Sequence, residues 1–337
     1  MGLNDSDAVH TVRRLIEGYQ ISQAIHAATM LGIADLLAAG SRTNAELAAA
    51  TGTHAPTLYR LLRALASVEV LRELDDRRFE LTALGECLRT DVPHSLASWA
   101  AFIGRPYYWQ AWAGLLHSVH TGENAFRHIN GVDVWTYRSN HPDENVIFNR
   151  AMIALSRRSF AELLTAYDFS RFHTVADVGG GNGALLAAIL TAYPALQAIL
   201  FDQPHVVPAA PALLAEAGVA ERCQVVAGDF FVAVPSGADA YVLRVIIHDW
   251  EDEESIRILR TVRTAIRTDG LLLLIEHVIG PPNEGREAKF SDLNMLVSPG
   301  GRERTQEEFG VLLAAADFQL VRVVDAGAYA VIEAVPV

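Results

Sequence analysis

Cysteine is scarce in this chain of 337 residues, and its scarcity excludes several classes of protein. Cys87 and Cys223 are the only two, and they form neither a disulfide framework nor the paired spacing of a zinc or redox motif. The first residues lack the basic and then apolar pattern of a secretory signal. No apolar run approaches the ~18 residues that span a bilayer. We therefore expect a cytoplasmic protein that has no membrane partner.

Positive charge is also in short supply. The chain has 27 Lys and Arg residues against 40 Asp and Glu residues, which gives a net charge of −13. A protein with this net negative charge repels the phosphate backbone of a nucleic acid unless its basic residues gather in a separate patch. We therefore expect no nucleic-acid partner. Hydrophobic residues make up 51% of the chain, enough for a sizeable core, and the length suits two domains or one domain with a substantial extension.

The first section, up to about residue 95, has a mainly helical pattern. Val9 to Ala38 carries apolar residues near helical spacing, which predicts a helix with a core-facing stripe. The stripe consists of Val12, Leu15, Ile16, Tyr19, Ile25 and Met30. Thr43 and Glu46 fit a capping box at the start of a second helix, and Pro56 opens a third that runs through Ser67.

A hairpin is predicted next, from Leu71–Leu74 and Arg78–Leu81 around the turn Asp75-Asp76. Helices followed by a hairpin outline a winged helix, so a DNA-binding regulator is an alternative hypothesis. The basic residues available for such a role are Arg60, Arg63, Arg72, Arg77 and Arg78. Their acidic neighbours are Glu69, Glu73, Asp75, Asp76 and Glu80. Because these acids largely neutralise the patch, the pattern favours a dimerisation or lid module.

Aromatic residues gather between residues 96 and 165. They are Trp99, Phe102, Tyr107, Tyr108, Trp109, Trp112, Phe126, Trp135, Tyr137 and Phe148. Such a concentration suggests the wall of a flat apolar pocket, although ordinary helix packing also accounts for many aromatic residues.

From Thr174 onward, short apolar runs alternate with helical patterns, and seven strands are predicted. They are Thr174–Val178, Ala198–Phe201, Gln224–Ala227, Ala240–Leu243, Leu271–Ile275, Leu320–Val324 and Tyr329–Ala334. This alternation predicts a parallel sheet covered on both faces, with ligands at the carboxyl ends of the strands. Asp325–Ala328 is too short for a helical crossover, so the last strand should pair antiparallel.

A glycine-rich turn follows the first of these strands and leads into a helix, which is typical of a nucleotide-like cofactor site. The spacing Gly179-x-Gly181-x-x-Ala184 also satisfies the loose dinucleotide fingerprint, with Asp202 23 residues after Gly179. Asp177 decides between the two ligands, because a carboxylate there would repel a pyrophosphate but could hold an ammonium group. S-adenosylmethionine carries that ammonium and no phosphate. The alternative role for Asp177 is a solvated turn acid or a cap.

Further acidic residues are expected along the same rim, each just after a strand. Asp202 could accept hydrogen bonds from ribose hydroxyls, and Asp229 could accept from the adenine amino group with Phe230 against the ring. Either acid could instead be a helix cap. After the fourth strand, His248 has an ordinary pKa near neutrality, so it is the candidate base for a substrate hydroxyl.

Five segments in order resemble the S-adenosylmethionine-dependent small-molecule O-methyltransferases, both plant caffeic-acid and flavonoid enzymes and bacterial natural-product enzymes. They are Val175–Gly183, Phe201–Val207, Gly228–Phe231, Ile247–Trp250 and Pro299–Thr305. The resemblance implies a Rossmann-like class I methyltransferase fold of class α/β. Its sheet has seven mostly parallel strands with the last antiparallel, and a winged-helix-like N-terminal domain forms a homodimer.

The resemblance also implies the roles of individual residues. His248 is the general base, flanked by Glu276 and Glu303 and followed by Asp249. The cofactor-binding set is Asp177, Gly179, Gly181, Asp202, Gly228, Asp229, Phe230, Arg244 and Trp250, with Arg244 where the family usually has lysine. The substrate-binding set is Trp109, Phe148, Met152, Asn294 and Met295.

Three parts of the chain are therefore expected. Residues 1–95 form the dimerisation domain, residues 96–165 form a helical connector that contributes to the substrate pocket, and residues 166–337 bind S-adenosylmethionine. The expected reaction is O-methylation of a small aromatic or polyketide-like compound without a metal, because no ligand cluster has a recognisable spacing. N-methylation, C-methylation and non-methylating chemistry on the same fold remain alternatives.

Overall fold

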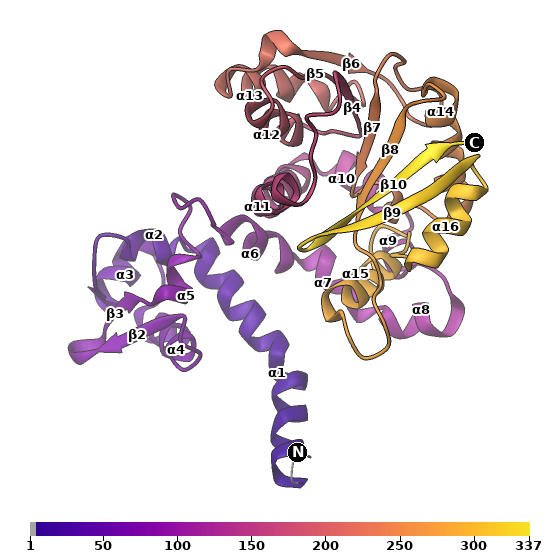
Figure 1. Ribbon diagram of the computed structural model, residues 1–337. Helices are drawn as coiled ribbons and strands as arrows, with labels where there is room; N and C mark the ends of the chain where they lie inside the picture. The colour runs from indigo at the N-terminus through magenta and orange to yellow at the C-terminus, as the bar shows by residue number, and fades with distance from the viewer. Residues whose placement is uncertain (1–4) are drawn as a thin grey trace. The chain divides into compact units, whose positions relative to one another are not determined.

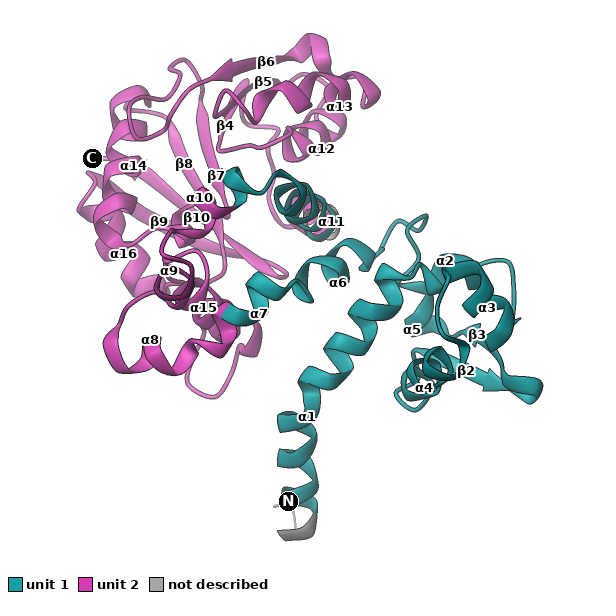
Figure 2. Cartoon of the chain, turned by 180° about the vertical axis from the view of Figure 1, so that it is seen from behind, with its two compact units in different colours: residues 1–110, 138–155 teal, residues 111–137, 156–337 magenta. Residues whose placement is uncertain are grey.

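The computed structural model describes the backbone of residues 5–337 and the side chains of residues 7–155 and 159–337. It divides into two compact units (Figure 2). The first contains residues 1–110 and 138–155, and the second contains residues 111–137 and 156–337. The helical stretch expected as a connector, residues 96–165, is thus shared between the units. Among the described helices, none is long and apolar enough to cross a membrane.

The first unit combines short helices with a three-stranded antiparallel sheet of order β1-β3-β2. Its elements begin with α1 (Asp5–Met30), α2 (Ile33–Leu37), β1 (Arg42–Thr43), α3 (Asn44–Thr51), α4 (Ala55–Ala66), β2 (Leu71–Leu74) and β3 (Arg78–Leu81). They continue with α5 (Ala83–Glu86), α6 (Ala97–Ile103) and α7 (Pro106–Ala113), whose last turn enters the second unit. The predicted capping box at Thr43 and Glu46 and the predicted hairpin are both confirmed.

The first predicted helix differs from the structure in two ways. It ends at Met30, because Gly32 adopts a left-handed φ of 65° before α2 begins. The expectation that its apolar stripe faces a core is wrong for the single chain. Val12, Leu15, Ile16 and Tyr19 are each more than half exposed. Helical periodicity identifies an apolar face but not what covers it.

The second unit contains the seven-stranded sheet, in the order β6-β5-β4-β7-β8-β10-β9 (Figure 1). Its strands are β4 (Thr174–Val178), β5 (Gln197–Asp202), β6 (Cys223–Ala227), β7 (Ala240–Arg244), β8 (Leu271–Glu276), β9 (Phe318–Ala326) and β10 (Tyr329–Pro336). All seven predicted strands are confirmed within two residues at either end. Neighbours from β6 through β8 pair parallel, whereas β10 pairs antiparallel with both β8 and β9, as expected.

Helices cover both faces of this sheet, and each face has its own apolar core. One face packs against α12 (Ala184–Ala192), α13 (Ala210–Glu216) and the C-terminal part of α11 (Pro142–Ala166), and the other packs against α14 (Asp252–Ala265) and α16 (Gln306–Ala314). The remaining helices are α8 (Leu115–Thr121), α9 (Ala125–Asn130), α10 (Val134–Asn140) and α15 (Arg286–Val297). Burial on both sides explains why β7 and β8 are apolar up to their last residue and why Asp177 is the only charged residue inside β4.

Candidate active site

The glycine turn after β4 is held by hydrogen bonds that its N–H groups donate to the neighbouring strand, β5. The Gly179 N–H donates to the Phe201 carbonyl at 2.8 Å, and the Gly181 N–H donates to Asp202 Oδ2 at 2.8 Å. The other oxygen of Asp202 accepts from the Gln203 N–H at 2.6 Å. Burial raises the pKa of Asp202, although these two N–H donors oppose the rise. Asp202 therefore ties the turn to the carboxyl end of β5.

Asp177 lies inside β4, before the strand ends at Val178. It is 2% exposed, so a solvated turn acid is excluded. Burial raises the pKa of Asp177 to about 7, while the Arg244 guanidinium acts in the opposite direction. Asp177 Oδ2 has no hydrogen-bond partner among the described residues. A Cβ on Gly180 would lie 2.6 Å from this oxygen, so glycine preserves the space beside it.

An orphaned, buried carboxylate oxygen is a costly feature unless a ligand completes it. The ammonium group of S-adenosylmethionine would supply a charged donor to Asp177 Oδ2. The residues of this rim therefore fit that cofactor better than a pyrophosphate.

The aromatic part of the rim follows β6. Asp229 Oδ1 accepts from the Phe231 N–H at 2.8 Å, and the Gly228 N–H donates to the Asp202 carbonyl at 2.9 Å. The Phe230 ring lies 6.2 Å from the Trp250 ring in an edge-on arrangement. Trp250 also meets Phe231 edge-on at 4.7 Å. Gly228 thus contacts Asp202, and the rings of Phe230, Phe231 and Trp250 form one group after Asp229.

Arg244 ends β7, next to β4 in the sheet. Its Nη2 donates to Ser159 Oγ at 2.8 Å, and its guanidinium lies over the rings of Tyr329, at 4.9 Å, and Phe160, at 5.1 Å. Planar stacking suits arginine better than lysine. This packing gives a physical reason for arginine instead of lysine at this position.

His248 lies on a short 3₁₀ turn, Ile247–Asp249, that follows β7. It is 6% exposed and faces three carboxylates. His248 Nδ1 lies 2.8 Å from Glu303 Oε1 and 3.9 Å from Glu276 Oε2, and Nε2 lies 3.6 Å from Asp249 Oδ1. When Nδ1 donates to Glu303, Nε2 is left as the nitrogen that can accept a proton.

The electrostatics of this cluster change the proton affinity of the imidazole. Burial alone would lower the pKa of His248, but Glu276, Asp249 and Glu303 outweigh it and raise the pKa to about 10. Burial likewise raises the pKa of Glu276 to about 7. Burial opposes ionisation of Glu303 too, but the charge of His248 and the hydrogen bonds from His248 and Ser291 together outweigh it and lower the pKa of Glu303. His248 is thus a stronger base than its ordinary pKa suggested.

Both glutamates are held by further contacts. Glu276 Oε1 accepts from the Ile246 N–H at 3.0 Å and the Ile247 N–H at 2.8 Å, on the turn that carries His248. Glu303 Oε1 also accepts from Ser291 Oγ at 2.6 Å. Second hydrogen bonds of this kind fix the orientation of a functional side chain. The imidazole is therefore held from two sides.

Arg304 and Gly301 belong to the Pro299–Thr305 motif, but the sequence indicated no role for either. Arg304 is 1% exposed, and it donates to the Ile247 carbonyl at 3.2 Å, the Trp250 carbonyl at 3.0 Å and Asp252 Oδ1 at 2.7 Å. A Cβ on Gly301 would lie 2.1 Å from the His248 carbonyl oxygen, so only glycine permits this approach. The sequence motif marked this segment as part of the site. Only the contacts in the structure show that Arg304 and Gly301 pack against the turn that carries His248.

Val245 precedes this turn with a φ of 57°, a left-handed conformation that is rare for a β-branched residue. Its N–H still donates to the Ile275 carbonyl at 3.0 Å, so the strained residue is tied to β8. Strain of this kind concentrates at functional sites.

The residues predicted to contact substrate lie in both units. Trp109, Phe148 and Met152 belong to the first unit, and Asn294 and Met295 lie on α15 in the second. Within the first unit, the Phe148 ring packs against the Phe102 ring at 5.5 Å and under the Arg138 guanidinium at 3.5 Å. Trp109 meets Tyr19 edge-on at 6.3 Å. Their substrate role stays a prediction.

Two groups of side chains could hold a metal ion among the described residues. One is His248, Glu276 and Glu303, and the other is His117, Glu123 and His128. In each, the ligand atoms lie within 4.8 Å of one another. The second group had no recognisable spacing in the sequence.

Comparison with known proteins agrees with this geometry. A family model described as an O-methyltransferase domain matches residues 112–319, and one described as an O-methyltransferase dimerisation domain matches residues 13–91. The chain is 44% identical to a phenazine O-methyltransferase of Lysobacter antibioticus, covering 96% of this chain and 95% of that protein. It is 41% identical to a mitomycin biosynthesis 6-O-methyltransferase of Streptomyces lavendulae, covering 95% and 92%.

Two of the relatives act on nitrogen: a phenazine-1-carboxylate N-methyltransferase of Pseudomonas aeruginosa, 32% identical over 96% of this chain and 96% of that protein, and a second enzyme. The second is an 8-amino-8-demethylriboflavin N,N-dimethyltransferase of Streptomyces davaonensis, 39% identical over 93% of this chain and 91% of that protein.

Solved structures extend the similarity to proteins with bound ligands. Human N-acetylserotonin methyltransferase in complex with S-adenosylmethionine has a TM-score of 0.89 at 29% identity, covering 100% of this chain and 99% of that one. An O-methyltransferase from neocarzinostatin biosynthesis has a TM-score of 0.82 at 32% identity, covering 94% and 96%. That structure holds S-adenosylmethionine and 2-hydroxy-5-methyl naphthoic acid.

Proposed function

Because the chain belongs to the S-adenosylmethionine-dependent O-methyltransferases, we propose that it methylates a hydroxyl group of a small aromatic or polyketide-like natural product with His248 as the general base. The single observation that carries the assignment is the 2.8 Å hydrogen bond from His248 Nδ1 to buried Glu303. This bond leaves Nε2 to receive a proton. Relatives that act on phenazine and mitomycin compounds support the substrate class.

The cofactor supplies a methyl group on a sulfonium, an electrophile whose leaving group is already activated. In our proposal Asp177 pairs with its ammonium group, Asp202 accepts from the ribose hydroxyls, and Asp229 and Phe230 meet the adenine. The chain's own chemical task is then to orient the acceptor and remove its proton. The substrate O–H proton passes to His248 Nε2, and the three carboxylates stabilise the imidazolium that forms.

The raised pKa of His248, about 10, bears on the type of acceptor. An ordinary phenol such as that of tyrosine also has a pKa of about 10. Because the three carboxylates raise the proton affinity of His248, this imidazole is a stronger acceptor for a phenolic proton than an ordinary histidine. An amine nucleophile has less need of a strong base, and this difference favours O-methylation over the N-methylation of the riboflavin relative.

The proposal is tested by incubating the purified protein with S-adenosylmethionine and a panel of hydroxylated phenazines, naphthoates and quinones. We expect stoichiometric formation of S-adenosylhomocysteine and an O-methyl product, identified by mass spectrometry and NMR. EDTA should leave the rate unchanged, because the scheme uses no metal. Methylation confined to matched amine analogues would contradict it. Retention on DNA that decreases with salt would instead support the regulator hypothesis.

The pH dependence of turnover should reflect the carboxylates around His248. A base works only when it is deprotonated, so kcat/KM should keep rising with pH well above 6.5 instead of levelling near that value. Glu303→Gln removes one negative charge and should lower the pKa of His248, which moves the rising limb to lower pH. If kcat/KM of the wild type levels off near pH 6.5, and the profile of Glu303→Gln is the same, the assignment of His248 as the base is contradicted. The profile is measured with two substrates whose hydroxyl groups differ in pKa. A midpoint that is the same for both substrates belongs to the enzyme, and a midpoint that shifts with the substrate belongs to the substrate hydroxyl.

We further propose that the chain forms a homodimer through the exposed face of α1. A dimerisation domain model covers most of this helix, and Val9, Val12, Leu15, Ile16 and Tyr19 form an uncovered stripe along it. Exposed apolar stripes of this kind mark protein interfaces.

Ile16→Glu should convert the dimer to monomers, because a charge placed in an apolar interface is desolvated without a partner. Glutamate favours the helix more than isoleucine, so the fold of α1 is retained. Sedimentation velocity at several protein concentrations measures the change, expected as at least a tenfold weaker self-association. Val311→Glu is the control, since Val311 is 72% exposed on α16, outside the matched dimerisation domain. Equal effects of both substitutions would argue against α1.

A further inference from the structure

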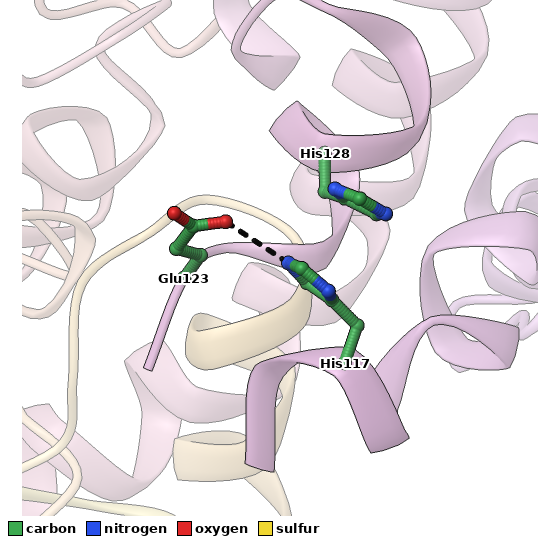
Figure 3. A group of neighbouring side chains, drawn as sticks. All are labelled: His117, Glu123 and His128. Carbon is green, nitrogen blue, oxygen red and sulfur yellow. Dashed lines mark hydrogen bonds and ion pairs between the residues drawn. The ribbon is translucent and has the colours of Figure 1, made fainter. Parts of the chain in front are cut away.

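A second cluster of metal-ligating side chains lies apart from the His248 site, on the turn between α8 and α9. His117 comes from α8, Glu123 from the turn and His128 from α9 (Figure 3). His117 Nε2 lies 3.0 Å from Glu123 Oε2. The two imidazole rings stack with centroids 3.6 Å apart and planes 13° from parallel. None of these residues has a role in the proposed methyl transfer.

The backbone that carries the cluster is held by several hydrogen bonds. Gly122 ends α8 with a left-handed φ of 77°, and the Glu123 N–H donates to Thr121 Oγ1 at 3.1 Å. Asn124 caps α9 by accepting from the Arg127 N–H at 2.8 Å. Asn124 Nδ2 also donates to the Leu296 carbonyl at 2.9 Å, at the end of α15. The turn thus presents its ligands from a fixed frame.

The chemistry of the three ligands is that of a divalent transition metal. Two imidazole nitrogens and one carboxylate oxygen form a His₂Glu set, which binds Zn²⁺ with a fourth position left for water. Ligand atoms around a tetrahedral zinc lie about 3.3 Å apart. The present Nε2 to Oε2 distance is 3.0 Å, and all three ligand atoms lie within 4.8 Å of one another. Because an imidazole binds a metal in its ring plane, the exposed His128 ring must turn out of the stack with His117 before both nitrogens face one ion.

We propose that His117, Glu123 and His128 form a surface binding site for a divalent transition metal, with Zn²⁺ as the probe ion. Binding joins α8 to α9 through the metal. Because Asn124 in the same turn bonds to the end of α15, the bound ion also stabilises the attachment of α15, which carries Ser291 beside Glu303.

The test uses full-length protein freed of metal with EDTA and then dialysed. Zn²⁺ is titrated by calorimetry, and Co²⁺ is titrated by its visible absorption, which becomes intense in a tetrahedral site. We expect one ion per chain in wild type and at least tenfold weaker binding in His117→Ala and in His128→Ala. His120→Ala is the matched control, because His120 is exposed on the same helix and lies outside the cluster. It should bind the metal as wild type does.

Two further measurements distinguish binding at this cluster from binding at the His248 cluster. Zn²⁺ should raise the melting temperature of wild type and of His120→Ala, but not of His128→Ala, whose melting temperature without metal should match wild type. Binding that survives both ligand substitutions and disappears in His248→Ala would place the ion at the His248 cluster and overturn the proposal. Absence of binding in wild type at millimolar Zn²⁺ would show that the cluster is only a His117–Glu123 ion pair, and would overturn it equally.

Discussion

Replacing His248 with alanine is expected to lower kcat for methyl transfer by about 10²–10⁴-fold, the usual contribution of a positioned base. Affinity for S-adenosylmethionine should change by less than about threefold, since the proposed cofactor contacts come from other residues. His248→Gln should show the same loss, because an amide fills similar space but does not accept the proton. Single-turnover kinetics and calorimetry with the methyl donor measure the two quantities separately.

The control for this substitution is His173→Ala, which removes an exposed imidazole from the same unit. Removal of His248 also leaves Glu276 and Glu303 buried without their cation, so urea unfolding must accompany the kinetics. A folded His248→Ala protein with near-normal kcat would refute the base assignment. A loss of cofactor affinity as large as the loss of kcat would indicate a structural role instead.

Asp202→Ala should weaken S-adenosylmethionine binding by about 10²-fold or more. The carboxylate is proposed to accept two hydrogen bonds from the ribose, and hydrogen bonds to a charged group contribute about 1.5–3 kcal/mol each. The substitution also removes the acceptor of the Gly181 N–H, so the glycine turn loses a contact. Calorimetric titration with S-adenosylhomocysteine measures the affinity without turnover.

Glu216→Ala is the matched control for Asp202→Ala, because Glu216 is an exposed carboxylate at the end of α13 in the same unit. It should leave the affinity unchanged. At saturating cofactor, Asp202→Ala should recover most of its kcat, since the base and its carboxylates are intact. Unchanged cofactor affinity in folded Asp202→Ala would exclude a ribose contact.

The sheet was predictable because its signals are local. Apolar runs of four to six residues, glycines at the turn after Val178 and the short link before Tyr329 each depend on neighbouring residues alone. The buried strands, the helix after the turn and the antiparallel last strand follow from such patterns. The interrupted first helix and its exposed stripe were not predictable in the same way, because coverage of a helix face depends on distant or separate chains.

The candidate site was only partly predictable. The rim acids Asp177, Asp202 and Asp229 follow from their places at strand ends, but the burial of Asp177 does not. The raised pKa of His248 is not predictable from the sequence, since two of the three carboxylates that raise it, Glu276 and Glu303, lie 28 and 55 residues further along the chain. Likewise, the proposed zinc-binding set of His117, Glu123 and His128 has no known spacing, and only the fold of α8 against α9 brings it together.

What the sequence determined by itself is therefore the order of elements, the glycine turn and the residue types available for chemistry. The tertiary structure alone decided which of these side chains meet in a low-dielectric interior. Proton affinity and metal binding depend on distances of a few ångströms between charges, and such distances arise only when strands and helices remote in sequence pack together. That is why the pKa of His248 is raised beside Glu276 and Glu303, and why the contacts of Arg304 and Gly301 with its turn appear only in the fold.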